Sequence, residues 1–326
     1  MQHELADVGL VFFVAREQCD VIHQTLKAAL QATPDSKTID ILVNGNAKLA
    51  LEIAQSLGSA SALDFGKGVR VWSIPVGDKA NAWNQYIHHI WNGEPIAFFL
   101  DGYVKVNPDA LALLGSAVLA NERALGGSGV PMQGRSAATL SNIMMSQGGF
   151  HGNLCCIKGV VIQKMRDLGI RLPVGLYRTD SLMGAFLAFN LNPADNAWDK
   201  DRIYIHPHAS WRVVPSNVSW WAKMRGQWNR LLRQKRGDLE NAAYREHLAV
   251  RKLPPASLPD RAREMVLQWL TECPEDAAKL LKGGVLRRRA VDQIKGQQSL
   301  GSAKLLPELI WDNGVIRVEP DRRPDT

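Results

Sequence analysis

The first third of the chain alternates between short, mainly apolar runs and segments with helical spacing. The apolar runs cover residues 8–14, 39–43, 69–74 and 96–100, and the last of them is unbroken. A short continuous apolar run is typical of a strand that is buried on both faces of a parallel sheet. After the first run, Ile22, Leu26 and Leu30 follow at a spacing of four, which marks one face of a helix. This alternation predicts βαβ units and an α/β fold with a mainly parallel sheet flanked by helices.

The fourth apolar run leads directly into Asp101-Gly102-Tyr103. Ligands of open α/β sheets bind just beyond the carboxyl ends of the strands, so Asp101 is expected to face a ligand. The alternative is that Asp101 only begins a turn. Asn107-Pro108-Asp109 follows and predicts a helix start, with Asn107 as the N-cap and Pro108 at the first helical position.

The pattern becomes less regular after residue 119. Gly126-Gly127-Ser128-Gly129 predicts a flexible or tightly turning segment. Further helices are expected at 135–146, 160–168, 179–189 and 218–236, and further strands at 150–157, 203–206 and 211–214. Asp195, Asp199 and Asp201 lie in a segment rich in Asn, Asp and Pro and are interpreted as turn residues.

These elements predict how the 326 residues divide. Residues 1–237 are expected to form the α/β domain, because the strand and helix pattern extends that far. Residues 238–318 are expected to form a small helical C-terminal extension, and residues 319–326 a disordered tail.

Composition narrows the class of protein only in part. Lys and Arg total 39 and Asp and Glu total 32, so the formal charge is +7. This excess fits anionic substrates, an anionic membrane surface or nucleic acid, and it does not choose among them. The four cysteines lack metal-ligand spacing, which favours buried thiols in a reducing compartment. No apolar stretch is long enough to span a bilayer and residues 1–4 do not begin a signal peptide, so a cytoplasmic protein is expected.

Three motifs occur in an order that points to one chemistry. Asp78-Lys79-Ala80 stands at a predicted helix start, one strand before Asp101-Gly102-Tyr103. Gly152-Asn153 then lies on a strand, and Thr179-Asp180 opens a later helix. This ordered set resembles the family 2 glycosyltransferases of the GT-A fold, over residues 8 to about 237. The Gln-x-x-Arg-Trp motif of that family has a loose counterpart at residues 227–230 or 233–237.

The resemblance implies roles for these positions. Asp180 matches the general base of the family, which takes the proton of the acceptor hydroxyl, and it implies an inverting reaction. Asp101 matches the position that holds a divalent cation, Mg²⁺ or Mn²⁺, on the donor diphosphate. The implied nucleotide-sugar-binding residues are Asn44, Lys79, Asp101, Tyr103, Gly152, Asn153, Arg233 and Arg236. From the residues alone, Lys79 could instead be a solvated helix end and Asp180 only a helix start.

Two departures from the family pattern weaken the expected metal site. Tyr103 stands where the family has a second acid, and Asn44 stands where it often has an aspartate near the nucleotide base. Asn44 can still bond a uracil or guanine edge. His206 and His208 are candidate imidazole ligands beside Asp101. We therefore expect the cation to bind weakly or not at all, with Lys79 and arginines in its place.

The function that the resemblance implies is transfer of a sugar from a nucleotide-diphosphate donor to a carbohydrate or lipid-linked hydroxyl. Synthesis of a surface polysaccharide or glycolipid is one setting for this reaction. The alternative is a catalytically weak member that binds a nucleotide-sugar and assists an assembly complex. A sugar nucleotidyltransferase is disfavoured, because residues 14–17 lack the glycine-rich loop of those enzymes.

The predicted helix at 218–236 mixes tryptophans with Lys and Arg. Such a helix could lie on an anionic membrane surface, which would place the protein at the inner face of the membrane. It could equally cover the core while its arginines approach the diphosphate. Nucleic acid is not expected as a partner.

Overall fold

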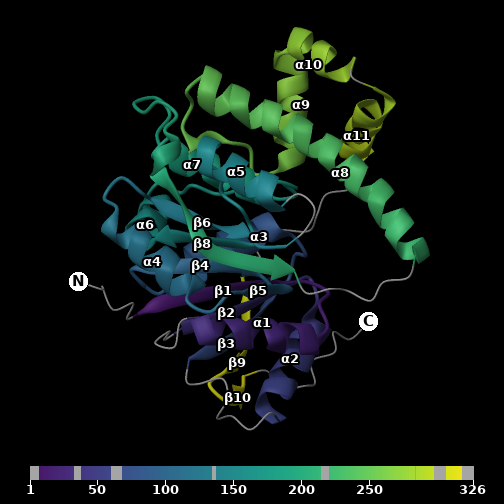
Figure 1. The fold of residues 1–326 in the computed structure, drawn as a ribbon. Coiled ribbons are helices and arrows are strands. Elements are labelled where there is room, and N and C mark those ends of the chain that lie inside the picture. The colour runs from purple at the N-terminus through teal and green to yellow at the C-terminus, as the bar shows by residue number, and fades with distance from the viewer. Residues whose placement is uncertain are drawn as a thin grey trace.

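A single mixed sheet of ten strands carries helices on both faces (Figure 1). The structure is a computed structural model that describes residues 7–32, 38–59, 68–133, 137–213, 220–282, 284–296 and 306–317, with backbone alone for 220–230. The strands run in the order β10 (Val315–Ile316), β9 (Glu308–Asp312), β3 (Val69–Ile74), β2 (Thr38–Asn44), β1 (Val8–Val14), β4 (Ile96–Asp101), β7 (Leu154–Lys158), β6 (Gly126–Pro131), β8 (Ile203–Val213) and β5 (Val104–Val106).

The helices cover the two faces of this sheet in separate layers. One face is covered by α1 (Cys19–Ala32), α2 (Ala47–Ser59) and α4 (Ala110–Ala120). The other is covered by α3 (Lys79–Gln85) with the π-helix η1 (Tyr86–Ile90), α6 (Gly159–Asp167) and α7 (Thr179–Ala188). The helix α5 (Ala137–Gln147) lies near β6 and β8.

The predicted parallel core is confirmed. Strands β3, β2, β1 and β4 are mutually parallel, and two of them have the predicted bounds, 8–14 and 69–74. Side chains of β1 alternate between the two faces, with Leu10 and Phe12 in one hydrophobic cluster and Val11 and Phe13 in the other. Every residue of β1 and β4 is buried, which explains why their sequences are unbroken apolar runs.

The prediction of a flexible or turning segment at 126–129 was wrong. These residues begin β6, a fully buried strand between β7 and β8. A Cβ atom on Gly126 would lie 2.4 Å from the carbonyl oxygen of Cys156, and one on Gly129 would lie 2.3 Å from that of Ala209. The glycines are therefore present because neighbouring backbones approach too closely for a side chain.

Other predicted bounds also need correction. The two short strands expected at 203–206 and 211–214 are one strand, β8, whose register with β6 shifts between Ser128 and Val130. The helix expected to open at Asn107 begins at Ala110 instead, because Asp109 takes a left-handed conformation with φ of 67°. The strand expected at 150–157 begins only at Leu154.

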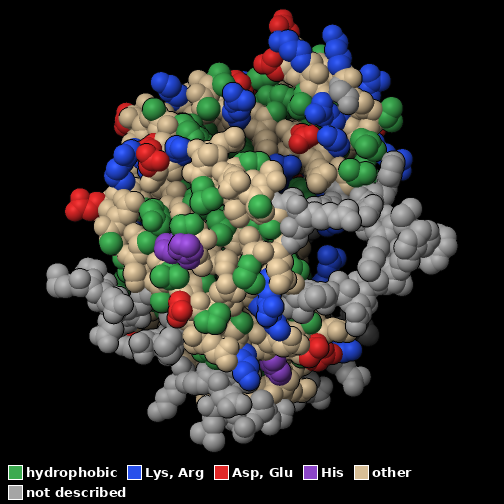
Figure 2. Space-filling model, viewed as in Figure 1, with side chains coloured by type: hydrophobic (Ala, Val, Ile, Leu, Met, Phe, Trp, Pro, Cys, Tyr) green, Lys and Arg blue, Asp and Glu red, His purple; other side chains and the backbone are tan. Residues whose placement is uncertain are grey.

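The C-terminal part adds a helical layer and then returns to the sheet. The long helix α8 (Trp220–Arg245) continues into η3 (Glu246–Val250), and the short η4 (Pro255–Ser257) precedes α9 (Ala262–Glu272), α10 (Pro274–Leu281) and α11 (Val285–Gly296). The expected boundary at residue 237 lies within α8. Strand β9 then pairs with the edge strand β3, so the extension also completes the sheet. Figure 2 shows Lys and Arg side chains gathered over the helical end of the molecule.

The tail predicted at 319–326 lies outside the described residues. Within the part of the chain that the structure describes, no helix is both long and apolar enough to cross a bilayer.

Candidate active site

The carboxyl ends of the parallel strands meet at one edge of the sheet. Phe13 is paired with Asp101, and Asn44 is paired with Ile74, so β1 to β4 end at nearly the same level. Asn44 is the last residue of β2, Asp101 is the last of β4, and Lys79 begins the helix after β3. Asn44, Lys79 and Asp101 therefore lie along one edge of the sheet, and their role in binding a nucleotide-sugar stays a prediction.

Asp101 is held by two neighbours and is only 9% exposed. The ammonium of Lys79 pairs with its Oδ1, and the hydroxyl of Tyr103 donates to its Oδ2 at 2.8 Å. The Lys79 Nζ also lies 5.3 Å from the centre of the Phe13 ring. Burial alone would lower the pKa of Lys79, but the Asp101 carboxylate outweighs it and raises that pKa above its usual value. Lys79 is thus a permanent cation at neutral pH.

The turn after β4 is fixed by contacts with β1. Gly102 donates its amide hydrogen to the Phe13 carbonyl at 2.9 Å, and its own carbonyl accepts from the Thr25 hydroxyl at 3.1 Å. A Cβ atom on Gly102 would lie 2.8 Å from Cγ2 of Val14. Close approach to β1 therefore requires glycine here, and it sets the position of Asp101 and Tyr103.

Asn44 presents a free acceptor at the same edge. Its amide nitrogen donates to the Val14 carbonyl at 3.3 Å, while its Oδ1 is buried and has no hydrogen-bond partner among the described residues. Beside it, Gly45 has φ of 62° and meets Gly77 backbone to backbone. A buried acceptor without a partner is costly, so this oxygen suits a ligand N–H group.

Asp180 reaches the same cluster from the other half of the sheet. It lies in the first turn of α7, and its Oδ2 accepts the amide hydrogen of Gly152 at 3.3 Å. A Cβ atom on Gly152 would lie 3.1 Å from the Lys79 Nζ and 3.6 Å from the Asp180 Oδ2. The lysine and the second carboxylate therefore flank one small residue.

Sequence reasoning missed His151, which lies between predicted positions. Its ring centre is 4.9 Å from that of Trp211, and its Nδ1 accepts from the amide of Asn153 at 3.2 Å. Burial lowers the pKa of His151 below its usual value, against the opposing influence of Asp180 and Asp101. The ring is therefore neutral at pH 7. A single histidine without a motif gave no signal that the fold would bring it to the site.

Arg236 and Arg233 lie on α8, at the loop that leads into α7. The Arg236 guanidinium donates to Glu240 at 2.8 Å and to the Gly175 carbonyl. Arg233 lies 5.9 Å from the ring centre of Tyr177. The contacts of both residues thus join α8 to the loop before Asp180.

The predicted metal ligands do not form a cluster. The Nδ1 of His206 accepts from the amides of His208 and Ala209, at 3.2 and 3.0 Å, within an irregular part of β8. Across the ranges that the structure covers, no group of three or more His, Cys, Asp or Glu side chains could hold a metal ion. Asp101 is also paired with an ammonium, which repels a second cation. The residues at this edge therefore do not fit a divalent cation.

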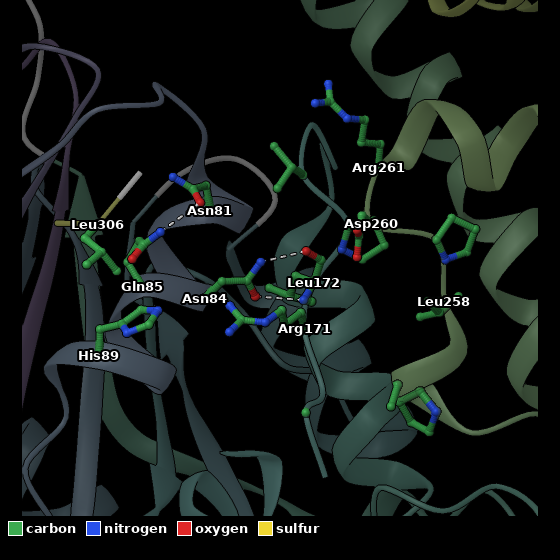
Figure 3. Close-up of a pocket in the computed structure, with 16 residues that line it drawn as sticks. Asn81, Asn84, Gln85, His89, Arg171, Leu172, Leu258, Asp260, Arg261 and Leu306 are labelled. Carbon is green, nitrogen blue, oxygen red and sulfur yellow. Dashed lines mark hydrogen bonds between the residues drawn. The ribbon is translucent and has the colours of Figure 1, made fainter. Parts of the chain in front are cut away.

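A separate cleft of about 460 Å³ lies between α3 and the C-terminal extension (Figure 3). Asn84 lines this cleft, and its side-chain amide donates to the Leu172 carbonyl and accepts from the Leu172 backbone amide, both at 2.8 Å. Arg171, beside Leu172, and Asp260, in the extension, also line the cleft. None of the predicted site residues lines this cleft.

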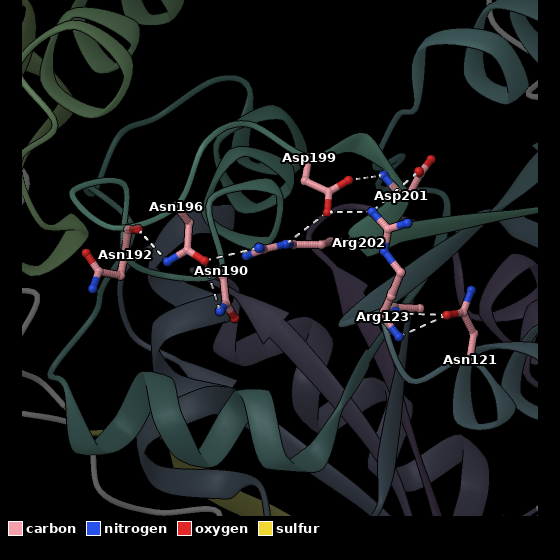
Figure 4. A network of polar contacts seen from close by, with 9 residues as sticks. Asn121, Arg123, Asn190, Asn192, Asn196, Asp199, Asp201 and Arg202 are labelled. Carbon is pink, nitrogen blue, oxygen red and sulfur yellow. Dashed lines mark hydrogen bonds and ion pairs between the residues drawn. The ribbon is translucent and has the colours of Figure 1, made fainter.

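The acidic loop before β8 has a structural role, as the turn interpretation predicted for Asp199 (Figure 4). Asp199 accepts from the amide of Asp201 at 3.0 Å and caps a short 3-10 helix. It also accepts from Arg123 at 3.1 Å and from Arg202 at 3.3 Å. These bonds hold the loop to Arg123, just before β6.

Comparison with solved structures identifies the fold. One similar structure is a mannosyltransferase from Pyrobaculum calidifontis, solved in complex with GDP-Man and Mn²⁺. The alignment covers 89% of this chain and 84% of the mannosyltransferase chain, with a TM-score of 0.56 and 15% sequence identity. The alignment with glucosyl-3-phosphoglycerate synthase from Mycobacterium tuberculosis covers 69% of this chain and 77% of the synthase chain, with a TM-score of 0.46 and 13% sequence identity. No protein-family model matches the sequence, and no curated protein matches it. The chain has the GT-A fold.

Proposed function

We propose that the protein is an inverting glycosyltransferase that moves a sugar from a nucleotide-diphosphate donor to a hydroxyl acceptor. The observation that carries this proposal is the position of Asp180 across Gly152 from the Lys79–Asp101 pair. A cation for the leaving diphosphate and a carboxylate for the acceptor proton then lie side by side. The GT-A fold supports the same assignment, because the mannosyltransferase with this fold was solved with GDP-Man.

The site residues divide the reaction between them. The acceptor oxygen forms a bond to the anomeric carbon while the bond from that carbon to the diphosphate oxygen breaks. The acceptor proton passes to the carboxylate of Asp180, and the leaving oxygen keeps the bonding electron pair. Lys79 stabilises the charge on the diphosphate. The unpartnered Oδ1 of Asn44 is suited to an N–H of uracil or guanine.

Calorimetry with UDP and GDP, followed by incubation with UDP-glucose and GDP-mannose, tests this function. We expect one of the two nucleotides to bind, and the matching sugar donor to be slowly hydrolysed or transferred. Asn44→Ala should weaken binding of that nucleotide. Asn92→Ala, which changes a residue between η1 and β4, should leave its binding unchanged. If neither nucleotide binds, the proposed function is wrong.

A carbohydrate or a lipid-linked hydroxyl remains the proposed class of acceptor. The lipid-linked form draws support from α8, whose sequence mixes Trp220, Trp221 and Trp228 with Lys and Arg. A peripheral contact of this kind requires anionic lipid and fades with salt. Flotation with phosphatidylserine vesicles at low and high salt tests it, and absence of flotation at low salt argues for a soluble acceptor.

A second function, binding of a nucleotide-sugar without turnover, is favoured by one observation. Tyr103 occupies the place of the second acid and bonds Asp101 instead of a metal ion. Under this alternative a donor binds, but neither hydrolysis nor transfer exceeds the background of the Asp180→Asn variant. Turnover above that background decides for the transferase.

A further inference from the structure

Both oxygens of the Asp101 carboxylate are already engaged by protein donors. Lys79 supplies an ammonium to Oδ1 and Tyr103 a hydroxyl to Oδ2. A carboxylate that receives an ammonium at hydrogen-bond distance is electrically neutralised, so it attracts a divalent cation only weakly. The Lys79 side chain is 31% exposed, however, and an ammonium has three donors. It can therefore keep Asp101 and still face a ligand.

Tyr103 cannot replace the missing acid as an anionic ligand. Its hydroxyl is a donor, because it gives its hydrogen to the Asp101 Oδ2 at 2.8 Å. Its hydrogen bond fixes the carboxylate in the orientation that Lys79 uses.

The segment that follows His208 offers no substitute ligands. From residue 209 to residue 237 the sequence contains no Asp, Glu, His or Cys. Over the same stretch it is rich in cations, namely Arg212, Lys223, Arg225, Arg230, Arg233, Lys235 and Arg236. This charge pattern suits a diphosphate that is bound by side-chain cations.

We propose that this protein binds the donor diphosphate without a divalent cation, with the Lys79 ammonium, held in place by Asp101 and Tyr103, in the position of the metal. The inference rests on the proposed function and deepens it. As the bond from the anomeric carbon to the diphosphate breaks, the electron pair stays on the leaving oxygen beside Lys79. The acceptor proton goes to Asp180, so no further reactant is needed.

Calorimetry on the full chain tests the proposal through binding rather than activity. UDP and GDP are titrated in EDTA and, separately, with Mn²⁺ and with Mg²⁺. We expect dissociation constants in EDTA and in either metal that agree within about threefold. A tightening of about tenfold or more with Mn²⁺ or Mg²⁺ overturns the metal-free site while leaving the transferase proposal intact. Absence of binding under every condition overturns the proposed function itself.

Variants of the pair then identify the cation. Lys79→Gln keeps a donor to Asp101 but removes the charge, and should weaken nucleotide binding in EDTA about tenfold or more. Lys105→Ala, which removes a lysine of β5 that bonds Gln24, is the matched control and should leave binding unchanged. The double variant Lys79→Gln/Tyr103→Asp should bind nucleotide only with Mn²⁺. The melting temperature shows whether the Lys79→Gln protein is folded. If it is folded and its nucleotide binding is unchanged, Lys79 does not hold the diphosphate.

Discussion

The two halves of the sheet contribute to the site in different ways. In the parallel half, formed by β3, β2, β1 and β4, each site residue lies at or just beyond the end of its own strand. In the mixed half, formed by β7, β6, β8 and β5, Gly152 and Asp180 are positioned by contacts between distant segments. Asp180, for example, bonds an amide that lies 28 residues earlier.

This difference shows which part of the site tolerates change. The parallel half is supported by strands buried on both faces, whose apolar side chains fill two separate clusters. The mixed half depends on backbones that touch where a glycine leaves no side chain. Small changes there should move Asp180 or unfold the half, whereas similar changes in the parallel half should be absorbed.

The largest effect is expected at Gly129 in β6. Gly129→Ala places a methyl group 2.3 Å from the carbonyl oxygen of Ala209, a backbone atom that cannot move aside. We expect a loss of about 3 kcal/mol in the free energy of unfolding, the upper range of overpacking. Gly58→Ala is the control, because nothing lies within 4 Å of its added methyl group in α2. It should stabilise the protein by about 0.5 kcal/mol. Urea unfolding of both variants measures the contrast, and equal stabilities would refute it.

The same contrast separates what could be predicted about the fold. The strands of the parallel half were predicted nearly to the residue, because short, mainly apolar runs are typical of strands that are buried in a parallel sheet. Strand β6 was missed, because its glycines are set by the approach of Cys156 and Ala209, which local sequence does not encode. The pairing of β9 with β3 joins segments more than 200 residues apart and also leaves no local pattern.

The second effect concerns Asp180, where the two halves meet. Asp180→Asn keeps the shape and an acceptor for the Gly152 amide but removes the charge and the basicity. Turnover should fall roughly a hundredfold, the range for losing a general base, while nucleotide binding stays within about threefold. The melting temperature and the dissociation constant for UDP or GDP are measured on the same preparation. Near-normal turnover with an intact fold would leave Asp180 as a helix residue only.

The candidate site was predictable where a motif marked it. The sequence placed Lys79 at a helix start and Asp101 at a strand end, and the structure brings their side chains into contact. The bond from Tyr103 to Asp101 could not be foreseen, because it depends on the tight contact of Gly102 with β1. His151 belongs to no sequence motif, and its place near the site follows only from the fold, which packs Trp211 against its ring.

A third, smaller effect should appear as pH falls. His88, in η1, bonds the Ile170 carbonyl at 2.9 Å, and so joins the parallel half to the loop before α7. Burial, with Arg171, His89 and Arg166 nearby, lowers the pKa of His88 from 6.5 to about 4. The unfolded chain therefore binds more protons than the folded one between these values, and stability is lost as pH falls through this window.

The measurement compares the wild type with His88→Gln by urea unfolding at pH 7 and pH 5. The wild type should lose about 1 to 2 kcal/mol more than the variant over this interval, because glutamine keeps a donor but binds no proton. The other histidines are common to both proteins and cancel in the comparison. Parallel losses in the two proteins would show that His88 does not titrate in this range.

The smallest effect is expected at Gly152, a residue of the mixed half that lies beside Lys79 of the parallel half. Gly152→Ala places a methyl group 3.1 Å from the Lys79 Nζ, which is the mobile end of a flexible side chain, so the fold should tolerate it. The ammonium must shift by a few tenths of an ångström, and its contact with Asp101 and the diphosphate should weaken. We expect UDP or GDP to bind about threefold to tenfold more weakly, with a change in stability below about 1 kcal/mol. Gly296→Ala in α11, where nothing lies within 4 Å, is the matched control and should leave affinity unchanged.

If Gly152→Ala unfolds the protein as Gly129→Ala is expected to, then Gly152 belongs to the packing of the mixed half rather than to the ligand site. If affinity and stability both stay at the wild-type values, the space between Lys79 and Asp180 is not where the donor lies.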